Sequence, residues 1–575
     1  MPRRRLALIA VIATALSLLA VQGSADAKKR PPHKAKKHHV KKKAKPKPLT
    51  AAQKLAKIKH IVVIYEENHS FDNLYGGWEG VHGLSEATTA QKTQVNQAGA
   101  PYTCLMQNDV NLAAESPTCT DTTTGATFTS HFTNAPFTID DFLKPGDTTC
   151  PPTPNSFSAT GYKKGTGAPG GCTRDIVHRF YQEQYQLNGG AQNRYTTGSD
   201  AVGLTQGVYD TKALPIYAYL HAAGHPKYVI ADQFFQAAFG GSFLNHQWLI
   251  AAATPTYAGA PANLHSAIDS NGMPTSYPLY KATGPVVDAA LTVVCPSPVA
   301  GRACGDFAVN TIQPTNPPFS SPTAAKLPLQ TQPTIGDRLT AKGIDWAWYA
   351  GGWSNANGDV NAPGYTNGAG PTCSDPGTAT GATYPRCPNG LFQYHHQPFN
   401  YFANYAPGTP GRAHLKDEAE FLQAANGSTS ACGLKPVSFV KPIGAENEHP
   451  GYASEQTGSN HLVTLLRAVE SSACKNDTMV IVTYDEFGGQ WDHVSPPGQG
   501  TTTAGPHDEW GPGTRIPALV IAPRMTLPFG VDHVEHDTTS ILATIEHRFG
   551  LQALGTRDAA VRDLSSVFRP VAPGK

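Results

Sequence analysis

The chain has 575 residues, of which 40% are hydrophobic and 15% are charged, and its formal net charge is +2. This composition excludes a disordered protein and supplies enough apolar residues for a large core, either in one large domain or in one domain with long insertions. The charge is unevenly distributed, because a basic segment near the N-terminus precedes an acidic body.

Residues 1–27 have the order of a cleaved secretory signal. Three arginines at positions 3–5 precede the apolar run Leu6 to Val21, and small residues end at Ala27. An uncleaved anchor is the lesser alternative, because the run is short for a membrane span and a small-residue cleavage site follows it. We therefore expect a secreted or extracytoplasmic protein.

Residues 28–50 predict a basic, disordered linker. Residues 28–48 contain eleven lysines and arginines, no acid and several prolines. Such a segment is usually solvated. The alternative is weak contact with an anionic wall, lipid or nucleic acid surface, and we expect no specific nucleic acid partner.

Short apolar runs rich in β-branched residues predict buried strands along the body of the chain. They are His60 to Tyr65, Tyr228 to Ala231, Ile344 to Tyr349, Val437 to Val440, Met479 to Tyr484 and Ile516 to Ile521. Helix-like segments occur at Ser242 to Ala253, Ser459 to Ser471 and Thr538 to Phe549. Strands that alternate with helices predict an α/β fold with a central, mostly parallel sheet flanked by helices.

Residues 85–170, 255–335 and 351–390 are rich in Gly, Pro, Thr and Asn and are predicted to be surface insertions. The chain has ten cysteines, and an even number in an exported protein usually pairs. A zinc site is a weaker alternative, because no C-x-x-C pair occurs. Proximity along the chain suggests five local disulfides: Cys104–Cys119, Cys150–Cys172, Cys295–Cys304, Cys373–Cys387 and Cys432–Cys474.

Acidic and amide side chains follow two of the predicted strands. Glu66, Glu67 and Asn68 come after HIVVIY, and Asp485 and Glu486 come after MVIVTY. Open α/β sheets bind ligands at the carboxyl ends of their strands, so we expect these oxygen ligands to converge on a divalent metal. The alternative is that the acids only cap turns or helices.

The stretch FGGSFLNHQWLIAAAT places Ser242 at the start of a predicted helix. Gly240 and Gly241 permit a sharp turn and close approach of N–H groups to an anion, and the positive end of the helix faces the same place. We expect Ser242 to be a nucleophile beside phosphate, activated by the metal, and Asn245 to hydrogen-bond a phosphoryl oxygen. The alternative is that Ser242 is an ordinary N-cap. No G-x-S-x-G elbow, P-loop or G-x-G-x-x-G motif supports another chemistry.

Several histidines lie in short polar stretches beside glycine, proline or acids, where packing in a core gives little reason for them. Imidazoles can donate to phosphate oxygens or protonate a leaving group, and their pKa suits mildly acidic activity. These candidates are His131, His395, His396, His449, His493 and His536.

Eight motifs follow one another between residues 58 and 551: VVIYEENHSFDNLYG, RDIVHRFYQEQYQLNGG, FGGSFLNHQ, YHHQPFNYF, ENEHPGYAS, TMVIVTYDEFGGQWDHVSPP, GTRIPALVIAP and DTTSILATIEHRFGL. Together they resemble the bacterial phosphoesterase family that contains secreted phospholipases C and respiratory-burst-inhibiting acid phosphatases. The resemblance implies an alkaline-phosphatase-like fold and a phosphoesterase catalytic domain over residues 51–575.

The resemblance also implies a role for each matching residue. It implies a divalent metal, Ca, Mg, Mn or Zn, held by Glu67, Asn68, Ser242, Asp485 and Glu486. It places around the phosphate Asn245, His131, His395, His396 and His449. His493 would act behind these residues or on the leaving group.

Two departures place the chain within the family. The phospholipase C pattern has a threonine in a G-T-x-P-N-R-like stretch and D-H-T-S near the end, whereas this chain has GGSFLNH and residues 537–540 read DTTS. Both differences favour the acid phosphatase branch, and the second leaves His536 without an assigned role. Sulfatases share the wider fold, but their C-x-P-x-R or S-x-P-x-R site is missing.

We therefore expect a secreted, metal-dependent phosphoesterase that acts on phosphate esters through a phosphoserine intermediate, as a broad-specificity acid phosphatase. The first alternative is a phospholipase C that releases phosphorylated headgroups from phospholipids. The second is a secreted metal- or phosphate-binding protein without turnover, which would not need a serine hydroxyl at a helix start.

Overall fold

The computed structural model describes residues 47–105, 120–121, 128–129, 133–141, 173, 175–199, 203–276, 280–297, 299, 301–366, 391–426, 431–500 and 505–574. Residues Leu49–Lys575 belong to one folded unit. The predicted signal and most of the predicted linker lie outside the described residues, so both stay predictions. No helix in the described ranges is long and apolar enough to cross a bilayer.

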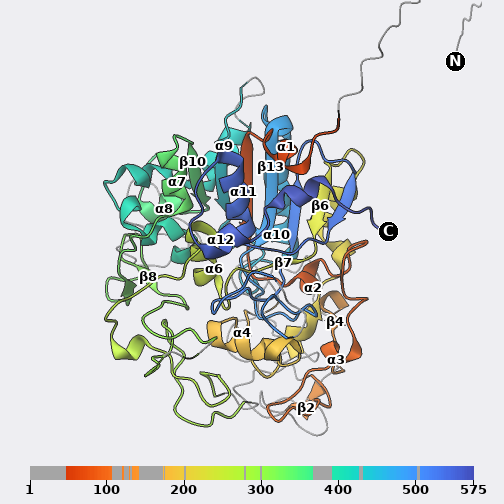
Figure 1. Ribbon diagram of the computed structural model, residues 1–575, viewed down its shortest axis with the longest axis vertical. Coiled ribbons are helices and arrows are strands. Elements are labelled where there is room, and N and C mark those ends of the chain that lie inside the picture. Colours follow the sequence, from red (N-terminus) through yellow and green to blue (C-terminus); the bar gives the residue numbers. More distant parts are fainter. Residues whose placement is uncertain are drawn as a thin grey trace, which may run out of the picture. The chain divides into compact units, whose positions relative to one another are not determined.

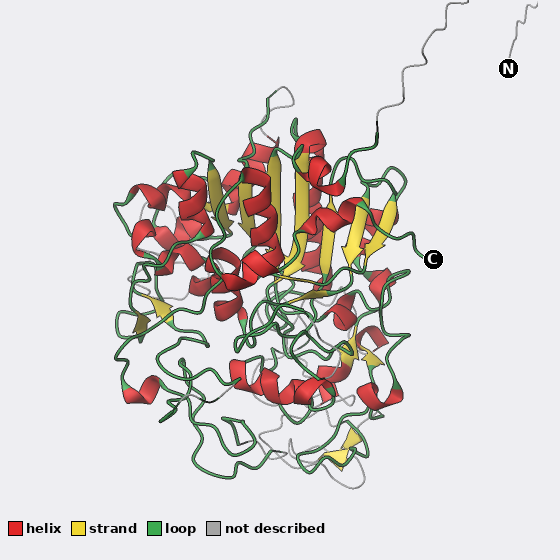
Figure 2. Cartoon of the chain, in the orientation of Figure 1, coloured by secondary structure: helices red, strands yellow, loops and turns green. Residues whose placement is uncertain are grey.

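An eight-stranded sheet forms the centre of the unit (Figures 1 and 2). Neighbouring strands are parallel except around β14, which is antiparallel to both of its neighbours. The predicted α/β fold with a mostly parallel sheet is therefore confirmed. The spatial order is β11 (Leu415–Asp417), β10 (Trp346–Ala350), β12 (Val437–Lys441), β1 (His60–Glu66), β13 (Thr478–Tyr484), β14 (Ala518–Ile521), β6 (Tyr228–Ala231) and β15 (Phe529–Asp532).

All six predicted strands occur within one or two residues of their expected positions. The central strands β1 and β13 are buried along almost their whole length, which explains why their sequences are continuous apolar runs rather than alternating ones. The edge strands β11 and β15 were not predicted, because their sequences LKD and FGVD are not continuous apolar runs and contain charged residues.

Helices flank the sheet in two groups. One group consists of α5 (Pro215–His221), α9 (Glu418–Asn426) and α10 (Glu455–Ser471), in which α10 packs on both others. In the other, α11 (Thr539–Phe549) packs on α6 (Ser242–Ala251) and α12 (Thr556–Ala560), and Figure 1 shows α11 in front of the central strands. The remaining α-helices are α1 (Ala51–Leu55), α2 (Phe71–Leu74), α3 (Thr89–Lys92), α4 (Phe180–Leu187), α7 (Ile335–Ala341) and α8 (Trp353–Asn357).

Loops and short elements gather at one end of the sheet (Figure 2). Four two-stranded ladders occur among the described residues, and none was predicted from the sequence. They pair β2 (Thr120–Asp121) with β3 (Phe128–Thr129), β4 (Phe137–Thr138) with β5 (Gly207–Val208), β7 (Phe234–Phe235) with β16 (His536–Asp537), and β8 (Gln313–Pro314) with β9 (Lys326–Leu327).

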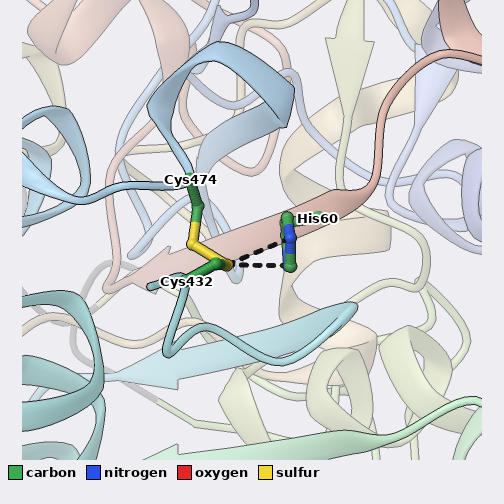
Figure 3. A group of neighbouring side chains, drawn as sticks. All are labelled: His60, Cys432 and Cys474. Atoms are coloured by element: carbon green, nitrogen blue, oxygen red, sulfur yellow. Dashed lines mark hydrogen bonds between the residues drawn. A yellow bond between two sulfur atoms is a disulfide. The ribbon is translucent and has the colours of Figure 1, made fainter. Parts of the chain in front are cut away.

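Two of the predicted disulfides are confirmed. Cys295 is bonded to Cys304 in the segment 255–335, and Cys432 is bonded to Cys474 across 42 residues. Figure 3 shows His60 of β1 beside the second bond, with Nε2 3.2 Å from Cys432 Sγ. Because both sulfurs are joined to each other, this group does not offer thiolate ligands to a metal. Each of the other three predicted pairs includes a cysteine outside the described residues.

Candidate active site

The acidic residues at the carboxyl ends of the neighbouring central strands β1 and β13 lie beside one another. Glu66 of β1 is paired with Tyr484 of β13, so the residues after each strand emerge side by side. The Asn68 backbone N–H donates to Asp485 Oδ1 at 3.1 Å. Asn68 has a left-handed φ of 60°, a conformation that asparagine tolerates better than most residues.

A close backbone approach joins the two segments. Gly488 has a φ of +63°, and a Cβ at this position would lie 2.2 Å from the Asn68 carbonyl oxygen. Only glycine fits such a contact. The glycines after Glu486 therefore allow this loop to close onto the residues that follow β1.

Ser242 faces the same carboxylates. It is the first residue of α6, the N-cap is Gly241, and no side chain caps the helix. The reading of Ser242 as an ordinary N-cap is therefore wrong. Its Oγ lies 3.3 Å from Glu67 Oε2, 3.4 Å from Asn68 Oδ1 and 3.4 Å from Glu486 Oε1. One hydroxyl proton can be donated to only one of these three acceptors.

The turn before Ser242 depends on glycine and on a buried glutamate. Gly240 has a φ of +89°, and a Cβ there would lie 2.6 Å from the Phe180 backbone nitrogen. The Gly240 N–H donates to Glu183, which also accepts from the Thr514 N–H and the Gln236 amide. Burial, offset in part by these donors, raises the pKa of Glu183 to about 7.

The Asn245 side chain hydrogen-bonds to the backbone of this turn and does not line the cavity described next. Its side chain is fully buried. Oδ1 accepts from the Ala238 N–H at 2.9 Å, and Nδ2 donates to the carbonyls of Ala238, Gly240 and Gly241. The expected contact with phosphate is corrected accordingly, because every polar atom of the Asn245 amide is already used by the backbone.

A cavity of about 420 Å³ opens above Ser242. Four histidines line it: His178, His395, His396 and His449. His395 and His396 belong to the 3-10 helix η6 (Tyr394–His396). The Nε2 atom of His396 lies 2.9 Å from Glu67 Oε1, and that of His449 lies 3.0 Å from Asn68 Nδ2. The other lining residues are Asp175, Ile176, Val177, Arg179, Gly241, Phe243, Val309, Asn310, Thr311, Gln393 and Tyr452.

His178 was not singled out from the sequence, although it lies in the motif RDIVHRFYQEQYQLNGG. Its Nδ1 lies 2.6 Å from the Ile176 carbonyl, which fixes the proton on that nitrogen. Its Nε2 lies 3.5 Å from both Glu486 Oε1 and Asn68 Nδ2. The ring also covers Gly241, since a Cβ there would lie 3.2 Å from it. His178 therefore flanks Ser242 on the open side.

Lys441 is the second residue that the sequence did not single out. It ends β12, is buried, and pairs with Glu67. Its Nζ also donates to the Tyr65 carbonyl at 3.0 Å. A lysine at the carboxyl end of a predicted strand was the available signal. Its place beside Glu67 follows only from the pairing of β12 with β1.

The carboxylates differ in their preferred charge state. Burial alone would raise the pKa of Glu67, but His396 and Lys441 hold it well below its usual range. Burial, together with the charge of Glu67, raises the pKa of Asp485 well above its usual range, and burial and Asp485 do the same for Glu486. Lys441 thus opposes the negative charge of both Glu67 and Asp485.

Three imidazoles near Ser242, those of His246, His395 and His396, favour the neutral form. Burial lowers the pKa of His395 and of His246 well below the usual range, and it lowers that of His396 to about 4 although Glu67 opposes the shift. His246 stacks on His396 with ring centroids 4.9 Å apart, and its Nδ1 lies 2.7 Å from the Ser242 carbonyl. Glu67, His246 and His396 each offer a ligand atom within 4.8 Å of the others.

His493 does not line the Ser242 cavity, although a role on the leaving group was expected of it. Its Nδ1 lies 2.5 Å from Asp72 Oδ2, and its ring meets that of His82 edge-on. Asp72 and Asp492 are both paired with Arg515. None of these five residues lines the cavity, so the expected leaving-group role is corrected to a place in a buried ion-pair network.

Two other histidines complete the comparison with the sequence. His131 lies outside the described residues, so its expected place near the phosphate stays a prediction. His536 is buried, with Nε2 3.0 Å from Ser566 Oγ and 3.4 Å from Asp532 Oδ2. It belongs to the packing around β16 and does not line the Ser242 cavity.

The predicted metal ligands fit a divalent cation. Oxygen atoms of Glu67, Asn68 and Glu486 surround Ser242 Oγ, and Asp485 is hydrogen-bonded to Asn68. Asp485 Oδ2 is buried and has no hydrogen-bond partner. A bound cation would favour the ionised form of these buried carboxylates, and hard oxygen donors suit Mg, Ca, Mn or Zn.

Comparison with known proteins identifies the family. The model of the phosphoesterase family matches residues 58–552. This chain belongs to the phosphoesterase family. The resemblance inferred from the eight motifs is confirmed, and the matched residues include β1, β13 and Ser242.

The matched relatives share only part of their length with this phosphoesterase. Phospholipase C B of Mycobacterium tuberculosis is 36% identical over 160 residues, which is 24% of this chain and 30% of that protein. Non-hemolytic phospholipase C of Pseudomonas aeruginosa is 29% identical over 179 residues, 26% of each chain. A solved protein of the alkaline phosphatase superfamily from Vibrio parahaemolyticus aligns with a TM-score of 0.28 and 13% identity, over 63% of this chain and 66% of that one.

Proposed function

We propose that this phosphoesterase hydrolyses phosphate esters through a phosphoserine intermediate on Ser242. The observation that carries the proposal is the position of the hydroxyl. Ser242 Oγ lies within 3.4 Å of two carboxylates and one amide oxygen, at the foot of a cavity lined by histidines. A binding protein would not require a hydroxyl at this point, because backbone N–H groups and imidazoles already suffice to hold an anion.

Glu67, Asn68, Ser242, Asp485 and Glu486 would hold a divalent metal. When bound, it would neutralise charge on the phosphoryl group and lower the pKa of the serine hydroxyl. The first N–H groups of α6 have no partner within the helix and lie at its positive end, so they would bind the phosphoryl oxygens beside Ser242.

The remaining steps would use side chains of this chain. Ser242 Oγ forms the new bond to phosphorus as the bond to the leaving oxygen breaks, and the hydroxyl proton passes to a neighbouring carboxylate. The leaving oxygen takes up a proton from solvent in the cavity that His178 and His449 line, and the carboxylate later returns its proton to Ser242 Oγ. Attack of water on the phosphoserine then releases phosphate and restores the serine. Positioning and charge neutralisation supply most of the rate enhancement.

Phosphate monoesters are the substrates we favour. Arg179 lines the cavity beside the first N–H groups of α6, and these donors suit the extra negative charge of a monoester. The second candidate is a phospholipase C activity on phospholipid headgroups. It is supported by the names of the matched relatives, and the cavity of about 420 Å³ is large enough for a headgroup.

The test compares p-nitrophenyl phosphate with p-nitrophenylphosphorylcholine, using the wild-type chain and Ser242→Ala. We expect faster p-nitrophenol release from the monoester and no turnover by Ser242→Ala. Faster release from the choline diester would move the chain to the phospholipase C activity. A Ser242→Ala protein with near wild-type rates would refute the nucleophile.

A further inference from the structure

We propose that Glu418, Glu446 and His461 form a metal site that is separate from the Ser242 cluster and binds a divalent transition metal of the zinc type. Glu418 begins α9, Glu446 lies in the loop between β12 and α10, and His461 lies in α10. The Nε2 atom of His461 is 2.6 Å from Glu418 Oε1 and 3.7 Å from Glu446 Oε2. The three ligand atoms lie within 4.8 Å of one another.

The ligand types select the class of metal. One imidazole and two carboxylates suit zinc and its neighbours, whereas calcium takes six to eight oxygen ligands. The side chain of Glu446 is 43% exposed, while those of Glu418 and His461 are 6% and 14% exposed. The site is thus closed on the protein side and open to solvent at Glu446, where water can complete the coordination.

One carboxylate oxygen of this group has no partner among the described residues. Glu418 Oε2 is buried and accepts no hydrogen bond there. Among the ion pairs of the described residues, Glu418 and Glu446 are joined to His461 and to no lysine or arginine. Burying a carboxylate is costly unless an opposite charge compensates it, and the buried Glu418 carboxylate has only the His461 imidazole beside it, which Glu446 shares.

The other groups of histidines, cysteines and acids outside the Ser242 cluster, within the described chain, do not combine three free ligands with an unpaired buried carboxylate oxygen. His60 stands beside Cys432 and Cys474, whose sulfurs are consumed by their disulfide. The group of Asp72, Asp492 and His493 already contains a cation, because the Arg515 guanidinium is 3.1 Å from each of the two carboxylates. Among the described residues outside the Ser242 cluster, only the Glu418 group combines three convergent ligands with an unpaired buried oxygen.

A metal at this site would join three separate segments. It would tie α9, α10 and the loop after β12 together, and that loop also carries His449, which lines the Ser242 cavity. We therefore expect bound zinc to raise the thermal stability of the chain. The proposal does not depend on the phosphoesterase activity.

The test counts bound zinc on the full-length purified chain. The protein is stripped with a chelator, dialysed against buffered Zn²⁺ and measured by inductively coupled plasma mass spectrometry. Glu446→Gln and His461→Gln are expected to hold one zinc ion fewer per chain than wild type, or to bind it at least about tenfold more weakly. Both should show a smaller zinc-induced rise in melting temperature.

Glu86→Gln is the matched control. Its carboxylate lies 3.4 Å from His82 Nε2 and is exposed, but among the described residues no third ligand completes a group with this pair. This variant should hold as much zinc as wild type. The half-exposed Glu446 keeps the test usable if His461→Gln does not fold. Wild-type zinc content and wild-type zinc affinity in folded Glu446→Gln would overturn the proposal. This result does not depend on measuring enzymatic turnover.

Discussion

Replacing Asn245 by leucine tests how the turn before Ser242 is held. The leucine has a similar volume but offers no polar atom. The Ala238 N–H, which donates to Asn245 Oδ1 at 2.9 Å, would be left buried without that partner. The carbonyls of Ala238 and Gly240 would keep the Gln236 amide as a donor.

The magnitude follows from this difference. An orphaned buried donor costs about 1–3 kcal/mol, and the weakened carbonyl contacts add less because each keeps a partner. We expect the Asn245→Leu protein to lose about 2–4 kcal/mol of unfolding free energy. We also expect slower turnover, because the turn that presents Ser242 is loosened.

Two measurements on the same preparation check this. Urea unfolding followed by tryptophan fluorescence gives the stability, and p-nitrophenol release gives the rate. Ser242→Ala is the matched control, one helical turn away, and should lose turnover while keeping the wild-type urea midpoint. If Asn245→Leu lost activity at an unchanged midpoint, the amide would contact the phosphate and the reasoning here would be wrong.

Four further outcomes are expected. Gly240→Ala should lower both stability and turnover, since its Cβ would meet Phe180. Gly259→Ala, with φ +69° and open space around it, should cost only about 1 kcal/mol of unfolding free energy, measured by urea unfolding. Replacing Cys432 and Cys474 by serine should lower the unfolding free energy by up to about 4 kcal/mol, because the bond closes a long loop; an unchanged midpoint would contradict this. His178→Gln should slow p-nitrophenol release at least about tenfold at an unchanged urea midpoint, and a matching loss of stability would assign His178 to packing instead. Dialysis against a chelator should abolish turnover and added divalent metal should restore it, so full activity after metal removal would argue against the metal-dependent reading.

The sequence alone predicted the sheet and the chemistry at its edge. The apolar runs of β1 and β13 are continuous because both faces of these strands are buried, so their position could be read without a structure. The parallel arrangement then predicts that residues following neighbouring strands meet, and Glu67 and Asp485 do lie in one cluster with Ser242. Their roles as ligands and nucleophile stay predictions.

The direction in which these side chains point could not be predicted from the sequence. Asn245 and Ser242 are close in the chain, yet one amide turns into the backbone of the preceding turn while the hydroxyl faces the carboxylates. His493 follows the same loop as Glu486 but pairs with Asp72. By residue type alone, each of these side chains was an equal candidate for the site. Only the path of the loop in the folded chain shows which of them reach Ser242.

Local pattern therefore determined which segments become strands and helices, and where polar residues interrupt them, because burial and periodicity act over a few neighbouring residues. Tertiary structure alone decided that Lys441 would sit against Glu67, that His178 would flank Ser242, and that Glu418 would meet His461. These pairs are separated along the chain by tens to hundreds of residues, and their approach is fixed by strand order and helix packing rather than by the residues beside them.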